Sequence, residues 1–296
     1  MGMNRSMDSL PPRATAASHT RYRIAQELSE LCPPVLGQEI AITGSVSKGL
    51  ADDPSDIEQV FYVQEIPGVQ ARDTWLRQIG ASAIIHDETT IEDGSLWSTF
   101  RFGEIWIEAG WQTFRQQEEL LRQILAAQVL DHHRLILGEI TSHALSLRGE
   151  GHLPRWRQQL TQYPPQLAQR LIANATDLWQ FPHLLEARWA LAQRHEPWRL
   201  AEVLLRELHN ILRVLFALNH QWEPEWKWIS QSSGALALKP HHLMERSTAI
   251  FTENDAKQRI AACIQLIYDT LTLLPVEYDV AQALNTVRES LDLHSY

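Results

Sequence analysis

GSVSKGLADDPSDIE, residues 44–58, is the segment of this chain that decides its fold. An apolar run at residues 39–43 precedes it, and a second apolar run at residues 59–63 follows it. Short apolar runs bounded by Gly, Pro, Ser and Asp are typical of buried strands joined by turns. The segment is therefore predicted to connect two strands through a glycine-containing turn that opens a short helix or loop.

The residue types within this segment predict a chemistry. Gly44 and Gly49 permit unusual dihedral angles and a close approach of the backbone to a ligand. Backbone amides at such a turn bind anions, and Ser45 adds a hydroxyl. Asp56 and Glu58 are two residues apart at the start of the second predicted strand, so both carboxylates are expected on one face. Acids on one face beside a phosphate-binding turn predict a site for Mg²⁺ bound to a nucleotide.

Residues 44–58 resemble the nucleotidyltransferase fold of the DNA polymerase β superfamily. The resemblance lies in Gly-Ser, a second Gly, and Ser-Asp-Ile-Glu at the start of an apolar strand. The usual pair there is Asp-x-Asp, whereas Asp-x-Glu is similar to the variant in aminoglycoside nucleotidyltransferases of the kanamycin type. That family has a third acid on a later strand. Glu108, in the alternating run 99–111, is the candidate for it, and Glu104 is the alternative, expected at a hairpin turn.

The resemblance implies Mg²⁺-dependent transfer of a nucleoside monophosphate, AMP from ATP by expectation, to a hydroxyl of a small-molecule acceptor such as an aminoglycoside-like antibiotic. It implies that Asp56 and Glu58 bind the metal and that Glu108 either accepts the acceptor's proton or binds a metal. Two alternatives stay open: a protein-modifying nucleotidyltransferase of the antitoxin kind, and a non-catalytic nucleotide-binding protein. Kanamycin-type enzymes dimerise across the cleft, so the resemblance also allows a homodimer.

Two lysines are candidate nucleotide ligands. Lys48 lies within the turn, and its alternative is a solvated surface lysine. Lys227 lies in the aromatic-rich segment 223–229, and its alternative is a lysine whose stem packs on Trp226 and Trp228.

Two further sets of residues have a functional and a structural interpretation. The first set consists of tryptophans near the acids, which either stack on an acceptor or base or pack in the core. The second set is a polar stripe at helical spacing, predicted to be a solvated helix face. The members are Trp97, Trp106 and Trp111 in the first set and Arg206, His209, Arg213 and His220 in the second.

The organisation predicted is α+β, with a small mixed β-sheet nucleotidyltransferase domain at residues 19–115 and an all-α helical-bundle domain at 116–296. Thr113 is expected to cap the first helix after the sheet. Residues 1–18 are expected to be a disordered tail without a secretory signal. The helical domain is expected to close over the cleft and supply the acceptor pocket. Helices are predicted at residues 20–31, 69–79, 118–130, 197–220, 254–274 and 279–293.

A second, softer resemblance lies in the helical part. Leu215–His220, followed by Pro224 and Lys227-Trp228, looks like a motif of helical domains attached to bacterial nucleotidyltransferases of unassigned substrate.

The composition of the chain limits the classes of partner that the protein is expected to bind. The 296 residues are 44% hydrophobic and 21% charged, with a formal net charge of −10, which argues against sequence-independent binding to DNA or RNA. A small or cationic acceptor suits this charge better, although acidity for solubility alone is common. No apolar run is long enough to cross a membrane. Cys32 and Cys263 lie far apart and predict neither a disulfide framework nor a zinc site, so a reducing cytoplasm is expected.

Overall fold

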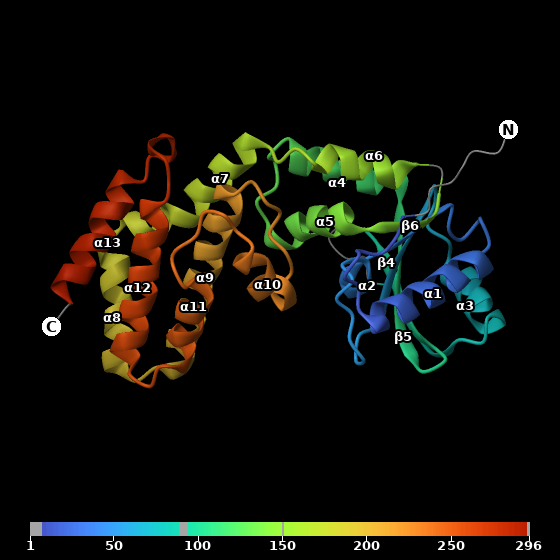
Figure 1. Ribbon diagram of the computed structural model, residues 1–296, viewed down its shortest axis with the longest axis horizontal. Coiled ribbons are helices and arrows are strands. Elements are labelled where there is room, and N and C mark those ends of the chain that lie inside the picture. Colours follow the sequence, from blue (N-terminus) through green and yellow to red (C-terminus); the bar gives the residue numbers. More distant parts are fainter. Residues whose placement is uncertain (1–7, 89–93, 150, 295–296) are drawn as a thin grey trace. The chain divides into compact units, whose positions relative to one another are not determined.

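A computed structural model describes residues 8–88, 94–149 and 151–294 of the chain (Figure 1). The chain divides into two compact units, Met1–Gln162 and Tyr163–Tyr296. The first unit is built on a β-sheet and the second is helical, so the α+β class predicted from the sequence is confirmed.

A mixed six-stranded sheet forms the centre of the first unit, with the strand order β3-β4-β5-β2-β1-β6. β2 and β5 run parallel, and every other neighbouring pair is antiparallel. A parallel pair needs a long crossover connection, which here is supplied by α3 (Val69–Gln78), β3 and β4. The strands are β1 (Glu39–Ile42), β2 (Ile57–Val63), β3 (Ser82–Asp87), β4 (Leu96–Phe102), β5 (Ile105–Thr113) and β6 (Leu145–Arg148).

One face of this sheet holds the apolar core of the first unit. Phe61 of β2 and Trp111 of β5 stack with their ring centroids 4.9 Å apart, and both side chains are fully buried. Trp75 of α3 meets Phe61 edge-on at 5.7 Å, and Leu28 of α1 (Ala16–Leu31) joins the same cluster. Because side chains alternate along a strand, Glu58 between the buried Ile57 and Gln59 must point to the opposite face.

Three helices and a strand that follow β5 belong to this unit rather than to the helical one. β6 pairs with β1, and Tyr62 of β2 contacts Phe114 and Trp156, the latter at 4.9 Å. The predicted boundary at residues 115/116 therefore differs from the division at 162/163, because a four-residue strand carries little periodic signal. The helices are α4 (Phe114–Leu125), α5 (His132–His143) and α6 (His152–Leu160).

The beginning of the described chain is packed against the sheet unit. The Thr15 side chain caps α1 by accepting from the Ser18 amide at 3.0 Å, and the Thr15 amide donates to the Gly49 carbonyl at 3.1 Å. An Asp8 carboxylate oxygen accepts from the Ser146 amide at 3.0 Å. The predicted disordered tail is thus wrong for residues 8–18, and residues 1–7 lie outside the described part.

The second unit is a bundle of helices around α9 (Pro197–Leu218), whose apolar side is buried along its length. Prolines occupy the first helical position of α7, α8 and α9, where the missing amide costs no hydrogen bond. The other elements are α7 (Pro165–Thr176), η1 (Asp177–Gln180), α8 (Pro182–Arg194), η2 (Trp226–Trp228), α10 (Ile229–Gly234), α11 (Leu243–Thr252), α12 (Ala256–Thr272), η3 (Val276–Tyr278) and α13 (Ala281–Leu293).

A buried charged network lies within this bundle. Glu207 of α9 is fully buried, accepts a hydrogen bond from Trp179 Nε1 at 2.6 Å and forms an ion pair with Arg188 at 2.5 Å. Within the described residues, no helix has the length and apolar character needed to span a membrane.

Candidate active site

Three carboxylates converge on the sheet face opposite the core of the first unit. Glu58 of β2 and Glu108 of β5 are register partners on neighbouring parallel strands. Asp56 directly precedes the first residue of β2. One carboxylate oxygen from each of the three lies within 4.8 Å of the others. The structure therefore brings together the three acids that the sequence singles out.

The electrostatics of this group favour a cation. Like charges directly opposite each other on adjacent strands destabilise a sheet, and these three side chains are only partly exposed. A divalent cation offsets that repulsion, and carboxylate oxygens are the ligands that Mg²⁺ and Mn²⁺ prefer. Asp56, Glu58 and Glu108 thus form a donor set that fits such an ion. Glu104, the alternative third acid, is exposed between β4 and β5, as expected for a hairpin turn.

The glycine-containing turn lies directly against these acids. Gly44 opens α2 (Gly44–Ser47) with a φ of +62°, a backbone region that residues other than glycine rarely adopt. A Cβ placed on Gly44 would lie 1.6 Å from Glu58 Oε2. The preceding residue, Thr43, donates its amide to the Glu58 carbonyl at 2.9 Å. The backbone conformation therefore favours glycine here, and any side chain at this position would displace the neighbouring carboxylate.

Hydrogen bonds fold the rest of the turn tightly. The Ser47 hydroxyl donates to the Gly44 carbonyl at 3.1 Å, and the Leu50 amide donates to the Ser45 carbonyl at 2.9 Å. Gly49 has a φ of +73°, and its carbonyl accepts from Thr15. As at the beginning of any helix, the first amides of α2 have no partner inside the helix. Ser45 is buried within this turn. The amides at the beginning of the turn thus lie beside the acids.

Lys48 is a buried, ion-paired lysine in the structure, and its binding of nucleotide stays a prediction. Its side chain is only 9% exposed, so the solvated-surface alternative is wrong. Its ammonium pairs with Glu139 of α5, at 2.7 Å from Oε1 and 3.0 Å from Oε2. Glu139 itself is 4% exposed. The sequence gives no sign of this pair, because Glu139 lies far along the chain on a helix with other polar residues.

Lys227, the other lysine expected to bind nucleotide, belongs to the second unit. It lies in η2, is about half exposed and pairs with Glu225 at 3.2 Å. Its part in nucleotide binding stays a prediction.

The tryptophans near the acids have three different environments. Trp111 is fully buried on the core face and donates Nε1 to the Leu36 carbonyl at 2.8 Å, so it packs rather than binds a ligand. Trp106 is exposed, with the Arg101 guanidinium 5.1 Å from its ring centroid. Trp97 lies across Gly110, where an added Cβ would be 2.8 Å from the indole ring.

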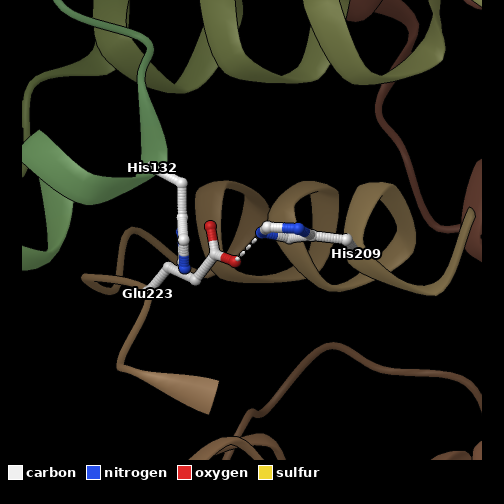
Figure 2. A group of neighbouring side chains, drawn as sticks. All are labelled: His132, His209 and Glu223. Carbon is white, nitrogen blue, oxygen red and sulfur yellow. Dashed lines mark ion pairs between the residues drawn. The ribbon is translucent and has the colours of Figure 1, made fainter. Parts of the chain in front are cut away.

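Part of the polar stripe on α9 faces a buried carboxylate instead of solvent. Figure 2 shows the His209 ring directed at Glu223, with Nε2 3.1 Å from Oε1. Arg213 Nε lies 3.6 Å from the other oxygen of Glu223, which is 7% exposed. The predicted solvated face is therefore wrong for His209 and Arg213, while Arg206 is exposed as expected. Glu223 was not singled out from the sequence, because it stands in an irregular segment without periodicity.

Comparisons with known proteins give two findings. Residues 130–229, less than half of the chain, match a domain family of unknown function, DUF4037. The matching segment begins in the first unit, before α5, and ends in the second. A nucleotidyltransferase-like protein from Exiguobacterium sibiricum 255-15 is similar in structure, with a TM-score of 0.41 and 12% sequence identity. The alignment covers 94% of this chain and 79% of that one. No curated protein matches the chain. Neither match assigns an activity to this chain.

Proposed function

We propose that the first unit is a metal-dependent nucleotidyltransferase, which transfers a nucleoside monophosphate from a nucleoside triphosphate, ATP by expectation, to an acceptor hydroxyl. One observation carries the proposal: the carboxylates of Asp56, Glu58 and Glu108 converge within 4.8 Å directly beside the turn that begins at Gly44. Acids that repel one another are held together at a position where a metal chelated by phosphates can bridge them.

Each part of this site has a role in the proposed reaction. Asp56 and Glu58 hold the metal, Mg²⁺ by expectation, which when bound offsets the charge on the phosphates and on the leaving pyrophosphate. The turn from Gly44 to Gly49, with Ser45, holds the β- and γ-phosphates. The acceptor oxygen attacks the α-phosphorus in line, a new P–O bond forms, and the bond to the β-phosphate oxygen breaks. Glu108 accepts the acceptor's proton or completes the metal site.

The acceptor we propose is a small molecule with a reactive hydroxyl, and an aminoglycoside-like antibiotic is one such molecule. A chain with a net charge of −10 favours a cationic acceptor over a polynucleotide. We assign the acceptor pocket to the second unit, and Lys227 to the nucleotide or the acceptor. This assignment stands on the resemblance to kanamycin-type enzymes.

The experiment that tests the proposal uses α-labelled ATP with Mg²⁺, a panel of aminoglycosides and lincosamides, and fractions of a cell lysate. We expect label on a small molecule and release of pyrophosphate. Label on a protein supports the antitoxin-like alternative, and nucleotide binding without transfer supports a nucleotide-binding protein.

Two variants make the result specific. Asp56→Asn removes one metal ligand, and we expect turnover to fall by about a thousandfold or more while the circular dichroism spectrum stays unchanged. Glu104→Gln, an exposed carboxylate in the β4–β5 turn, is the matched control and should keep full activity. Undiminished turnover in Asp56→Asn contradicts the assignment of the site.

A further inference from the structure

The ion pair between Lys48 and Glu139 joins the phosphate-binding turn to a helix far along the chain. The ammonium lies within 3.0 Å of both carboxylate oxygens, and the two side chains are 9% and 4% exposed. His143, one turn further along α5, places Nδ1 3.3 Å from Oε1 of the same carboxylate. Burial of two charges is costly unless their geometry is good, and loss of one partner leaves the other uncompensated.

The two residues of this ion pair stand on elements that differ in length and in support from their neighbours. Glu139 stands on α5, which Asp131 caps by accepting from the Arg134 amide at 3.1 Å. Thr141 of the same helix accepts a buried hydrogen bond from Gln117 of α4 at 2.9 Å. Lys48 ends the four-residue helix α2, which is too short to hold its shape alone. We therefore take α5 as the rigid element, and the ion pair as a contact through which α5 holds the turn in place.

We propose that Lys48 and Glu139 are positioning residues for the triphosphate: their ion pair fixes the turn from Gly44 to Gly49 in its binding shape before nucleotide arrives. The proposal deepens the proposed function and rests on it. It also gives a role to the beginning of the segment that matches DUF4037, since residues 130–229 include Glu139. Lys48 acts on the nucleotide through the backbone of the turn and not by contacting phosphate.

In a competing arrangement, Lys48 binds a phosphate group of the nucleotide directly. The two arrangements predict opposite effects of Glu139→Gln on nucleotide affinity. If Lys48 were to leave Glu139 and bind a phosphate group, removing the Glu139 charge would release the lysine and tighten nucleotide binding. If the pair positions the turn, removing either charge loosens the turn and weakens binding. Lys48→Met and Glu139→Gln thus act in the same direction in the positioning arrangement and in opposite directions in the competing one.

The test measures the Kd of the complete protein for a non-hydrolysable ATP analogue with Mg²⁺, by calorimetry. We expect each single variant to weaken binding by about tenfold and the double variant by no more than either single one. The exchanged pair Lys48→Glu with Glu139→Lys should recover part of the affinity. Lys48→Arg, which keeps the charge, should stay within about threefold of the unaltered protein. Glu118→Gln in α4, which breaks an exposed ion pair with Arg155, is the control and should change nothing.

A second measurement separates failure of this proposal from failure of the proposed function. Amide hydrogen exchange of residues 44–50 is followed without nucleotide, where positioning predicts faster exchange in Glu139→Gln and unchanged exchange in Glu118→Gln. Unchanged exchange at 44–50 in Glu139→Gln overturns the positioning role, whether or not the protein binds ATP. Equal or tighter analogue binding by that variant overturns it as well. Binding that Asp56→Asn does not weaken counts against the proposed function alone.

Discussion

A substitution at Gly44 would affect both the backbone conformation of the turn and the position of a carboxylate in the candidate site. Any side chain there must adopt a left-handed backbone, and its Cβ would overlap Glu58 Oε2 at 1.6 Å. The first requirement affects stability, and the second affects the position of a carboxylate that we propose binds metal. A matched glycine separates the two effects. Gly103, in the β4–β5 turn, has a φ of +60°, and an added Cβ there meets nothing within 4 Å.

We predict that Gly44→Ala and Gly103→Ala both lose about 1–2 kcal/mol of unfolding free energy from the left-handed backbone. Gly44→Ala should lose more than this, and it alone should weaken binding of Mn²⁺ and of Mg²⁺ with an ATP analogue, because Glu58 is displaced. Urea unfolding and metal titration check the two effects. Equal metal affinity in both variants contradicts the place given to Gly44.

Some residues of the candidate site can be predicted from the sequence, and others cannot. Glu58 and Glu108 can be identified because acids within otherwise apolar strands have few structural reasons to be there, and Asp56 can be identified because it directly precedes such a strand. The Lys48–Glu139 pair cannot be predicted from the sequence, because its two charged residues lie far apart in the chain and neither stands in a distinctive pattern. Likewise, helical spacing identifies His209 as part of a polar stripe, but the sequence does not indicate that Glu223 is its partner.

At the scale of single elements, the beginning of α4 shows how local sequence fixes structure. The sequence predicts that Thr113 caps this helix, and the structure confirms it: the Thr113 side chain accepts from the Gln116 amide at 3.1 Å. Gln116 Oε1 in turn accepts from the Thr113 amide at 2.8 Å, which completes a capping box. The cap lies where β5 ends, so it sets the direction in which the chain leaves the strand that carries Glu108.

We predict that Thr113→Ala lowers the unfolding free energy of the first unit by about 1 kcal/mol, because the Gln116 amide at the helix start loses its acceptor. Thr74→Ala is the control: Thr74 is exposed in the interior of α3 and donates only to the Gln70 carbonyl. Its loss should change stability by less than about 0.5 kcal/mol. Equal effects in urea denaturation contradict the capping role.

Several long helices are predicted close to their observed bounds, whereas others of ten residues or more, α5, α7, α8 and α11, have no predicted bounds. The helix expected at 197–220 is α9 (Pro197–Leu218), and that expected at 254–274 contains α12 (Ala256–Thr272). The strand β6 is missed because its four residues alternate too briefly to give a signal, and its pairing with β1 is non-local. The predicted boundary at 115/116 differs from the division at 162/163 because β6 and the helices that pack with it are not assigned to the sheet domain.

At the scale of the whole molecule, each unit contains one buried cysteine. Burial raises the pKa of Cys32 in the first unit to about 12, with Arg148 opposing the shift, and burial also raises the pKa of Cys263 in the second. A raised thiol pKa keeps the reactive thiolate scarce near pH 8, so neither cysteine should react with a thiol reagent until its unit unfolds. The two thiols therefore report on the unfolding of the two units separately.

We predict that Glu207→Ala unfolds the second unit at lower urea, because it leaves Arg188 buried without its partner at a cost of about 3–5 kcal/mol. Labelling of Cys263 should move to lower urea, while labelling of Cys32 should stay where it is. Mass spectrometry of the labelled peptides resolves the two sites. A matched shift at both cysteines shows instead that the units unfold as one cooperative body.

The position of β6 also bears on how the nascent chain folds as it leaves the ribosome. β1 is the first of the described strands to be synthesised, yet within the described part of the chain its outer edge pairs only with residues 145–148. Until that segment emerges, β1 presents unpaired amides and carbonyls to whatever is near, the situation in which strands add to neighbouring polypeptides. Cells that make this protein thus face a period of exposure during translation that lasts until the short sixth strand has been added.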